Sequence, residues 1–512
     1  MSILFSDRFQ RILFALVVCL TVGFLLYPHY LPMVDLPQHA AQVVALDDLL
    51  KKQSRWSDML QVNWDTPYLS IYLFWLGLYQ IFDIVWSSKL VVAGLFLFYI
   101  FSIRLLNREF NNDPIVDWVA LSCYFGFAFQ WGFVGYLAGI PVGVLFFVVC
   151  KRWLDTGQWK YWLLIVLLGV VSYFSHILTF AFFCFVSYVY FLSISLRLNW
   201  RQRGTFTLPY LLFATLLFRY LSLPNPVPFK YYQYDWKWHG VIEKTVNLFY
   251  MPWNMVQLFY YDMAVAVVWA APFFLGYRLS RQPERYAPLI AALLIWYVMP
   301  SFAFQTAFLY ERFALFVPLF YYLVWERQAK VHGWRCSMAQ LGGIFFIGAV
   351  VALVFKVYDN HIKFNHSLVV SHFQSVLAQM QPEKRTLQMM GMFDSGEGSL
   401  TSHQELLHFG QWYQAEKHGW TDYSFASAHA MPVRLKMEYL YRGYGYNRYA
   451  EEGILSKTLD CMPYDYLLVR SSRLSTEKIE RFLQGNPKCA EMALKMKTPD
   501  WLLFERSSKG KP

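Results

Sequence analysis

The sequence predicts a polytopic, all-α membrane domain followed by a smaller α/β domain. Three observations predict this fold class. Of the 512 residues, 57% are hydrophobic, 20% are aromatic and only 15% are charged, which is too little polar surface for a soluble globule. Long apolar runs alternate with short clusters of Lys and Arg as far as about Tyr358. Beyond Tyr358 the apolar runs stop, and a mixed sequence of about 150 residues follows, a usual size for one domain.

The basic residues are explained by membrane topology. The formal net charge of +11 could indicate a nucleic-acid partner, but most Lys and Arg residues lie in short clusters between apolar runs. The positive-inside rule produces this pattern, so we expect contact with membrane lipid and no nucleic acid. The first apolar run, 12–27, is not followed by a small-residue cleavage site, and we expect it to remain as the first helix rather than to be removed as a signal peptide.

The same clusters set the orientation of the predicted spans, each of which needs about 20 apolar residues. With the N-terminus in the cytoplasm, the cytoplasmic clusters are Arg104 with Arg108, Lys151 with Arg152, Arg197 with Arg201 and Arg203, Arg278 with Arg281 and Arg285, and Arg327 with Lys330 and Arg335. The spans, about eleven in number, are 10–28, 88–106, 116–132, 134–151, 160–178, 180–197, 206–222, 261–279, 286–304, 310–325 and 337–356. The C-terminal domain then lies on the periplasmic or extracellular side.

Segment 67–83 leaves the count of spans open. It is apolar enough to cross, but its Tyr and Trp residues suit the membrane interface, so we expect a juxtamembrane or re-entrant helix. In the alternative, this segment is a true span and 116–151 form one bent element that contains glycines and Pro141. The predicted organisation is a membrane domain over 1–356, with a first outer loop at 29–66 and a long outer loop at 223–251, and an extracytoplasmic α/β domain over 357–512.

The C-terminal region has the pattern of a small α/β domain. Strand character is found at 384–393, 464–470 and 500–505, and helical character at 402–417 and 476–483. Its only cysteines are Cys461 and Cys489, whereas the other five lie in or beside the membrane spans. In an oxidising compartment such an even pair predicts one disulfide.

Asp35 and His39, which follow the first predicted span and so lie outside, are the first candidate catalytic residues. If a helix starts directly after Asp35, this residue lies at or next to the N-cap, and His39 and Gln42 follow on a similar face about one and two turns later. A carboxylate there is favoured as the anion, which suits a metal ligand or a base that accepts a proton from a hydroxyl. The alternative is a simple N-cap role.

His176, Glu311 and Arg312 are candidates at the outer ends of two further spans. An ionisable group that faces a cavity at a membrane helix end is a functional candidate, although interfacial histidines often only hydrogen-bond to carbonyls. Arginine grips phosphate through two parallel hydrogen bonds, so Arg312 could hold a phospholipid-like substrate, with Glu311 beside it. The alternative is a local contact between Glu311 and Arg312 that anchors the helix.

The outer loop at 223–251 supplies the remaining candidates for substrate binding, Lys230, Asp235 and His239. Its aromatic rings, interleaved with polar groups, could stack on sugar rings, and its lysines could meet a phosphate. Most of these rings are equally explained as the ordinary aromatic belt of a membrane protein. The chain contains no Walker loop, HExxH motif, CxxC pair or nucleophile elbow, which removes most support for ATP-driven transport and zinc proteolysis.

The order of these features resembles the GT-C superfamily of membrane glycosyltransferases: a first helix, an outer loop with an Asp and an amphipathic helix, many further spans and an outer α/β domain. Short segments are also similar to landmarks of a bacterial group of GT-C-like membrane proteins. They are Val34-Asp-Leu-Pro-Gln-His39, Trp131-Gly-Phe-Val-Gly-Tyr136, Tyr173-Phe-Ser-His176 and Glu311-Arg312-Phe313. The resemblance covers the whole membrane part.

The resemblance implies transfer of a sugar from a polyprenyl phosphate carrier to an acceptor at the outer face of the bacterial cytoplasmic membrane, as part of building the cell envelope. In GT-C enzymes an Asp in the first outer loop acts as base or metal ligand, and Asp35 matches it. Leu36 stands where protein mannosyltransferases have a second acid. A divalent cation such as Mg²⁺ or Mn²⁺ on Asp35 is therefore one expectation, and a metal-free base is at least as well supported.

We therefore expect an inverting glycosyltransferase in which Asp35 activates the acceptor, a glycan, lipid or protein. His39 or His176 would orient or relay the proton, and Arg312 would neutralise the departing lipid phosphate. This hypothesis requires Asp35, His176 and Arg312 to meet in one cavity. One alternative is a transporter or assembly protein for lipid-linked glycans. The ionisable groups argue against it, because they cluster at one face, whereas transporters usually bind their substrates near the bilayer midplane. The other alternative is a noncatalytic scaffold on a GT-C-like frame.

Overall fold

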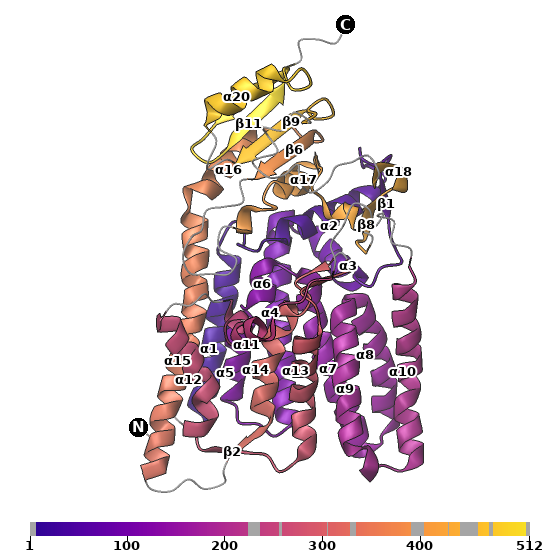
Figure 1. Cartoon of the computed structure of the whole chain (residues 1–512), viewed down its shortest axis with the longest axis vertical. Helices are drawn as coiled ribbons and strands as arrows, with labels where there is room; N and C mark the ends of the chain where they lie inside the picture. The colour runs from indigo at the N-terminus through magenta and orange to yellow at the C-terminus, as the bar shows by residue number, and fades with distance from the viewer. Residues whose placement is uncertain are drawn as a thin grey trace.

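The protein is a helical bundle that carries a mixed β-sheet on one end (Figure 1). The computed structural model describes residues 7–223, 236–254, 259–304, 306–327, 334–390, 404–428, 430–440, 459–470 and 475–507. The sheet, orange and yellow in the figure, stands above the bundle. We call the end of the bundle that carries the sheet the domain end.

Six helices among the described residues are long and apolar enough to cross a membrane, judged by length and composition. They are α1 (Asp7–Leu26), α4 (Ile84–Glu109), α7 (Val134–Thr156), α9 (Ile177–Ile194) with the adjoining turn η1 (Ser195–Arg197), α10 (Trp200–Leu221) and α15 (Trp334–His366). The chain is a multi-pass membrane protein.

The other predicted spans correspond to shorter or divided helices. They are α8 (Trp159–Ser175), α12 (Phe259–Phe274), α13 (Ala287–Val298), the pair α5 (Val116–Cys123) and α6 (Phe127–Trp131), and the pair η5 (Glu311–Leu315) and α14 (Phe316–Leu323). Every predicted span thus contains helix. Because these pieces are short, the count of about eleven crossings stays a prediction.

Two glycines divide the region 116–151. A Cβ atom on Gly126 would lie 2.3 Å from the carbonyl oxygen of Pro252, so the chain between α5 and α6 accepts no larger residue there without movement. Gly132, which ends α6, has a φ of +86°, in the left-handed region that favours glycine. The region therefore forms three helices, α5, α6 and α7, rather than the single bent element of the alternative count.

Segment 67–83 contains a short helix, α3 (Leu69–Tyr79), of 11 residues. Such a helix is about 16 Å long, roughly half of the thickness of a hydrocarbon core. It lies at the domain end, next to α2 (Leu36–Leu50) of the first loop (Figure 1). This length and position favour a juxtamembrane helix over a crossing.

The C-terminal part contains a five-stranded mixed sheet in the order β10-β11-β9-β6-β7. Its strands are β6 (Arg385–Met390), β7 (Trp420–Thr421), β9 (Tyr466–Arg470), β10 (Met492–Lys497) and β11 (Leu502–Arg506). Strands β6, β9 and β11 fall on the predicted strands. The edge strand β10 was not predicted, because Lys495 and Lys497 on its exposed side obscure the apolar pattern.

The helices of this part are α16 (Leu368–Gln379), α17 (Gln411–Lys417) and α20 (Thr476–Gly485). The predicted disulfide between Cys461 and Cys489 is present, with both cysteines buried beside β9 and α20. Helix α15 continues past 356, where the sequence predicted the boundary, and ends only at His366.

The first loop is bound to the C-terminal part. Strand β1 (Leu60–Val62) pairs antiparallel with β8 (Val433–Leu435), and the backbone N–H of Asn63 donates to the carbonyl of Pro432 at 2.7 Å. The indole of Trp56 donates to the carbonyl of His418 at 3.0 Å. Two segments far apart in the sequence therefore build one wall at the domain end.

The remaining elements are short. They are α11 (Val241–Tyr250), η3 (Met251–Trp253), β2 (Tyr277–Leu279) paired with β5 (Trp325–Arg327), η4 (Pro283–Tyr286), β3 (Phe302–Ala303) paired with β4 (Thr306–Ala307), η6 (Gln404–Leu406), η7 (Phe425–Ser427) and α18 (Met437–Leu440). The β3–β4 hairpin and η7 matter for function, because both border the cavity described next.

Candidate active site

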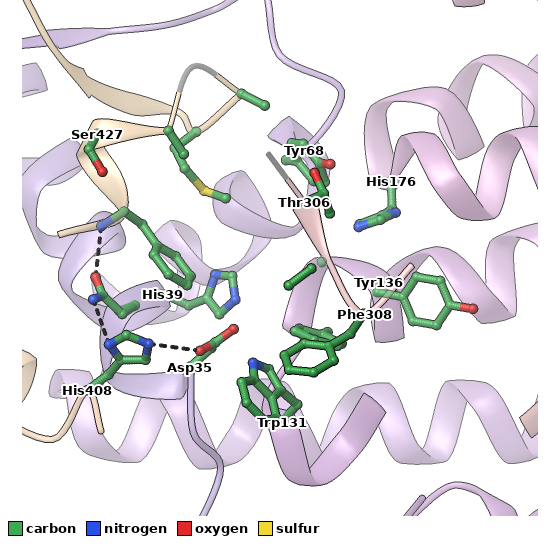
Figure 2. A pocket seen from close by; sticks show the side chains of 18 of the residues that line it. Asp35, His39, Tyr68, Trp131, Tyr136, His176, Thr306, Phe308, His408 and Ser427 are labelled. Carbon is green, nitrogen blue, oxygen red and sulfur yellow. Dashed lines mark hydrogen bonds and ion pairs between the residues drawn. The ribbon is translucent and has the colours of Figure 1, made fainter. Parts of the chain in front are cut away.

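A cavity of about 420 Å³ lies at the domain end, between the bundle and the C-terminal part. Figure 2 shows it with Asp35, His39, His176 and His408 around it. Its lining comes from the first loop and α2, from α3 and α6 to α10, from the β3–β4 hairpin and η5, and from the C-terminal part: Asp35, Gln38, His39, Tyr68, Tyr72, Trp131, Phe133, Gly135, Tyr136, His176, Tyr220, Phe302, Phe304, Thr306, Ala307, Phe308, Arg312, Leu407, His408, Tyr423, Ser424, Phe425, Ser427, Ala428, Ala430 and Met431. Asp35, His176 and Arg312 all line this cavity, as the hypothesis from sequence required.

The backbone of Asp35 is anchored on the turn between α6 and α7. Its N–H donates to the carbonyl of Trp131 at 2.9 Å. A Cβ atom on Gly132 would lie 2.9 Å from the same nitrogen, so glycine allows this close approach. Asp35 occupies the N-cap position of α2, but its side chain makes no capping hydrogen bond. The carboxylate is therefore not used by the helix that it precedes.

The Asp35 carboxylate is buried, with 5% of the residue exposed. Its Oδ1 lies 3.3 Å from Nε2 of His408, but no donor among the described residues forms an aligned hydrogen bond to this oxygen. Burial raises the pKa of Asp35 well above its usual value, and the positive charge of Arg312 opposes this rise. A carboxylate with a raised pKa is a stronger base for a hydroxyl proton.

His39 lies on α2 at the cavity wall, where its Nδ1 is 2.5 Å from the hydroxyl of Tyr72. Burial, assisted by the charge of Arg312, lowers the pKa of His39 to about 3, so the imidazole is neutral near pH 7. Gln42, predicted on a similar face, does not line the cavity. Its Oε1 instead accepts a hydrogen bond of 3.0 Å from the backbone N–H of Val433, which ties α2 to β8.

His176 is the single residue between α8 and α9. Its Nδ1 accepts a hydrogen bond of 3.2 Å from the backbone N–H of Leu178 and so caps α9, whereas the alternative from sequence was a hydrogen bond to a carbonyl. A Cβ atom on Gly139 of α7 would lie 3.0 Å from the Cβ of His176, so the glycine makes room for this turn. Because Nδ1 accepts, Nε2 carries the proton of the neutral ring and is free to donate.

Arg312 of η5 also lines the cavity. Its Nε donates to the carbonyl of Phe308 at 3.1 Å and its Nη2 to that of Ala307 at 3.2 Å, while the guanidinium packs 3.8 Å above the centre of the Phe133 ring. No carboxylate of the described chain lies within ion-pair distance of it, Glu311 included. A cation that faces a cavity without a paired anion can bind an anionic ligand.

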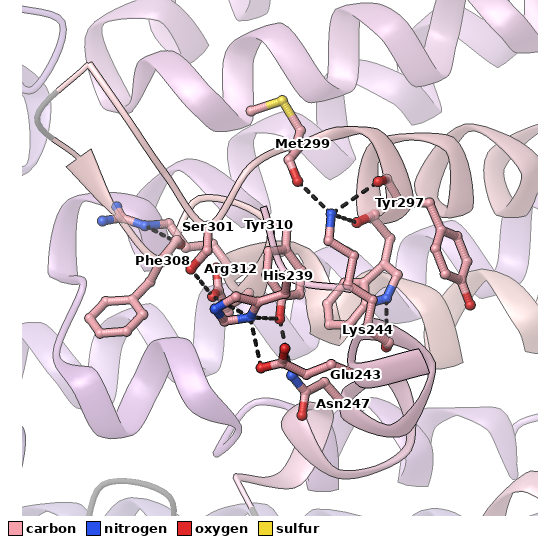
Figure 3. Close-up of polar contacts among 12 residues, drawn as sticks. His239, Glu243, Lys244, Asn247, Tyr297, Met299, Ser301, Phe308, Tyr310 and Arg312 are labelled. Atoms are coloured by element: carbon pink, nitrogen blue, oxygen red, sulfur yellow. Dashed lines mark hydrogen bonds and ion pairs between the residues drawn. The ribbon is translucent and has the colours of Figure 1, made fainter. Parts of the chain in front are cut away.

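Glu311 does not line the cavity but belongs to a second polar cluster, which Figure 3 shows around His239, Tyr310 and Lys244. It accepts a hydrogen bond from the Ser301 hydroxyl and lies 4.0 Å from Nδ1 of His239. The same nitrogen is 2.8 Å from the Tyr310 hydroxyl and 3.1 Å from Glu243. His239 thus belongs to this second cluster rather than to the cavity. The other two loop candidates, Lys230 and Asp235, lie outside the described residues.

Lys244 closes the second cluster. Its buried Nζ donates to three carbonyls at the end of α13, those of Trp296 at 3.1 Å, Tyr297 at 3.0 Å and Met299 at 2.6 Å. The ammonium is therefore fully used in holding the chain that leads from α13 into the β3–β4 hairpin. We call Glu311, His239, Tyr310 and Lys244 the closed cluster.

Gln38 and His408 are among the polar residues of the cavity that were not predicted. Gln38 lies one residue before His39 on α2, and His408 lies between η6 and α17, in a segment for which the sequence predicted only helix. A hydrogen bond of 3.1 Å joins Nε2 of Gln38 to Nδ1 of His408. No local sequence signal connects a histidine here to Asp35, because the fold alone brings the two segments together.

The donor set around Asp35 does not suit a divalent cation. Among the described residues no group of three His, Cys, Asp or Glu side chains is arranged to hold a metal ion. The groups around Asp35 include the neutral rings of His39 and His408, the indole N–H donor of Trp131 and the cation of Arg312, which would repel Mg²⁺ or Mn²⁺. We therefore derive no chemical step through a metal.

Comparison with known proteins shows the fold. The chain matches the cryo-EM structure of the arabinofuranosyltransferase AftD from mycobacteria with a TM-score of 0.54 at 14% sequence identity. The match covers 98% of this chain and 40% of that protein, so this chain spans less than half of AftD. No protein-family model and no curated protein sequence matches. The resemblance to GT-C membrane glycosyltransferases is thus confirmed at the level of the fold.

Proposed function

We propose that the protein is an inverting glycosyltransferase that moves a sugar from a polyprenyl-phosphate donor to an acceptor at the outer face of the bacterial cytoplasmic membrane. The observation that carries this proposal is that Asp35 and Arg312 face one buried cavity without forming an ion pair with each other. A base and an anion-binding cation that face the same cavity are what direct displacement of a lipid phosphate needs. The fold shared with AftD supports the same class of reaction.

In the proposed reaction Asp35 accepts the proton of an acceptor hydroxyl. The hydroxyl oxygen forms a bond to the anomeric carbon of the donor sugar while the bond from that carbon to the phosphate oxygen breaks. The lipid phosphate leaves with the bonding electron pair, and Arg312 stabilises the negative charge that develops on it. Because attack and departure take place on opposite faces of the sugar, the anomeric configuration inverts.

The two histidines of the membrane part are proposed to orient the reactants. His39 is neutral near pH 7 and is bound to Tyr72, so it suits a hydrogen bond to a sugar hydroxyl better than a charge role. His176 can donate from Nε2, since its Nδ1 is occupied by the cap of α9. The rings of Tyr68 and Tyr136 pack against His176 at 4.8 and 5.2 Å and restrict its rotation.

The proposed topology places the N-terminus in the cytoplasm and the C-terminal part outside. The C-terminal part supplies one wall of the cavity through Tyr423, Phe425 and Met431, so it would cover the site and contribute to the choice of a glycan, lipid or protein acceptor. Its disulfide fits an oxidising compartment. Attachment of a thiol-reactive, membrane-impermeant probe to an added surface cysteine in α20 of intact cells would test this orientation.

The test of function uses proteoliposomes and a panel of radiolabelled polyprenyl-phosphate sugars. We expect the wild-type protein to release the sugar from one donor and the Asp35→Asn variant to release none, with equal insertion of both. Full activity of Asp35→Asn would overturn the proposal. Saturable donor binding or movement across the bilayer, with no bond broken by any donor of the panel, would instead support the transporter alternative.

A further inference from the structure

His408 reaches the cavity from the C-terminal part and lies against the proposed base. Its Nε2 is 3.3 Å from Oδ1 of Asp35, and both residues are buried, with 4% and 5% of their surfaces exposed (Figure 2). His408 is separated from Gln38, its other partner, by 370 positions in the sequence. His408 can donate a hydrogen bond to Asp35 only if Nε2, rather than Nδ1, carries the ring proton.

The orientation of the Gln38 side chain is fixed by the backbone. Its Oε1 accepts a hydrogen bond of 2.9 Å from the N–H of Phe425, and its Nε2 donates to the carbonyl of Tyr423 at 2.5 Å. Exchanging the oxygen and the nitrogen would place acceptor against acceptor and donor against donor. The amide therefore has one favourable orientation.

This orientation determines the tautomer of His408. The second hydrogen of the Gln38 amide points to Nδ1 of His408 at 3.1 Å, so Nδ1 must hold a lone pair. Burial lowers the pKa of His408 to about 3, and the ring is therefore neutral near pH 7. A neutral ring with an unprotonated Nδ1 carries its proton on Nε2, the nitrogen that faces Asp35.

The indole of Trp131 also interacts with the Asp35 carboxylate and favours its charged form, whereas the other groups that face Asp35 are engaged elsewhere. His39 on α2 is hydrogen-bonded to Tyr72 of α3, and Arg312 of η5 donates to two backbone carbonyls. Oδ1 of Asp35 has no aligned donor among the described residues. The separation of 3.3 Å is longer than a good hydrogen bond to a carboxylate, and such contacts in active sites commonly tighten when the substrate binds.

We propose that His408 is a positioning residue for the base: with its tautomer fixed by Gln38, it donates Nε2–H to Oδ1 of Asp35 and leaves Oδ2 directed at the acceptor hydroxyl. The proposal rests on the proposed function. It makes the C-terminal part a required component of the active site, because the residue that orients the base comes from that part. A bundle without it would retain Asp35 but not its orientation.

The kinetic test compares His408→Phe with His408→Gln in proteoliposomes. Loss of a hydrogen bond to a charged group predicts that His408→Phe lowers kcat roughly 10- to 100-fold while the KM for the donor changes less than about twofold. In His408→Gln the amide nitrogen takes the place of Nε2, so kcat should return to within roughly fivefold of the wild type. An unchanged kcat in His408→Phe, or a Gln variant as slow as the Phe variant, would overturn the role.

A spectroscopic test needs no donor or turnover. In protein labelled with ¹⁵N-histidine, the His408 signals are those lost from the spectrum of the His408→Gln variant. We expect a neutral ring protonated at Nε2 near pH 7, and a mixture of tautomers in Gln38→Met. Protonation at Nδ1, or a cation, would overturn the tautomer argument. A wild-type protein with the expected tautomer but no transfer from any donor would overturn the proposed function instead.

Discussion

Two polar clusters meet at η5, and they differ in how much of their hydrogen-bonding capacity is used. Arg312 faces the cavity with Asp35, and neither charge is paired with a counter-ion of optimal geometry among the described residues. The adjacent residue, Glu311, faces the closed cluster, where Tyr310, His239 and Lys244 are bound to one another, to neighbouring side chains or to backbone carbonyls. Adjacent residues of one 3-10 turn thus belong to two clusters, one with unused hydrogen-bonding groups and one in which nearly all of these groups are paired.

This difference indicates that the cavity cluster binds a ligand, whereas the closed cluster supports the structure. Buried charges without partners are costly, and a protein retains them where a ligand completes them. Among the described residues of the closed cluster, the only buried side-chain atom without a hydrogen-bond partner is Oε2 of Glu311. The closed cluster instead fixes η5 and the β3–β4 hairpin, and so positions Arg312. Substitutions in the cavity should therefore change catalysis, and those in the closed cluster should change stability.

The largest effect is expected for Asp35→Asn, which should lower sugar transfer by at least about a thousandfold, because an amide cannot accept the hydroxyl proton. The folded protein should tolerate the change, since the amide removes the cost of a buried charge. Transfer in proteoliposomes and thermal unfolding in detergent would measure the two effects.

The matched control is Glu311→Gln, the same loss of a carboxylate in the closed cluster. We expect transfer within about fivefold of the wild type, since Glu311 does not line the cavity. If both variants lost transfer equally, the division between the two clusters would be invalid and Glu311 would belong to the reaction, as its position beside Arg312 in the sequence suggested.

The next largest effect is expected for Arg312→Met. Loss of the guanidinium should lower kcat/KM by roughly 100- to 1000-fold, because the leaving phosphate loses its cation. Arg312→Lys should recover only part of this, since an ammonium lacks the planar fork that binds two phosphate oxygens. Donor titrations of both variants would show it. Equal activity of Arg312→Met and the wild type would show that the lipid phosphate of the donor does not bind at Arg312.

Lys244→Met should affect stability and leave the chemistry intact. Three carbonyls at the end of α13 would lose their donor, which predicts a loss of about 1–3 kcal/mol in the free energy of unfolding. Transfer per folded molecule should stay within about threefold of the wild type. Thermal unfolding with activity measured at low temperature would separate the two quantities, and a stable but inactive variant would contradict the support role of the closed cluster.

The membrane part of the fold and the cavity residues within it were largely predictable from sequence. Apolar length and positive clusters gave a helix at every predicted span, and Asp35, His176 and Arg312 were singled out as charges or imidazoles at helix ends. These signals are local, since each depends on a residue and its immediate neighbours. The cysteine pair was predictable because only two cysteines occur in the C-terminal region.

What could not be predicted depends on contacts between distant segments. Gln38, which directly precedes the candidate His39, was not itself predicted. No local pattern in the sequence shows that its amide contacts Tyr423 and Phe425. His408 lies in a segment whose pattern is only helical, and only the fold places it against Asp35. Glu311 failed to join Arg312 in the cavity because adjacent residues of a 3-10 turn point in different directions.

The smallest effect concerns the wall that holds α2 against the C-terminal part. Nδ1 of His418 lies 2.9 Å from Asp48, and hydrogen bonding to this carboxylate raises the pKa of His418 above its usual 6.5. A raised pKa means that the folded state binds the proton more tightly, so the stabilisation is complete below pH 6.5 and is lost as the pH rises through the folded value. Because the imidazole is partly exposed, we expect less than about 1 kcal/mol. The unfolding temperatures at pH 5.5 and 8.5 should therefore differ slightly more in the wild type than in Asp48→Asn. Sugar transfer at a given pH should be the same in both proteins. A loss of transfer in Asp48→Asn would show that the contact between His418 and Asp48 belongs to the active site rather than to its structural support.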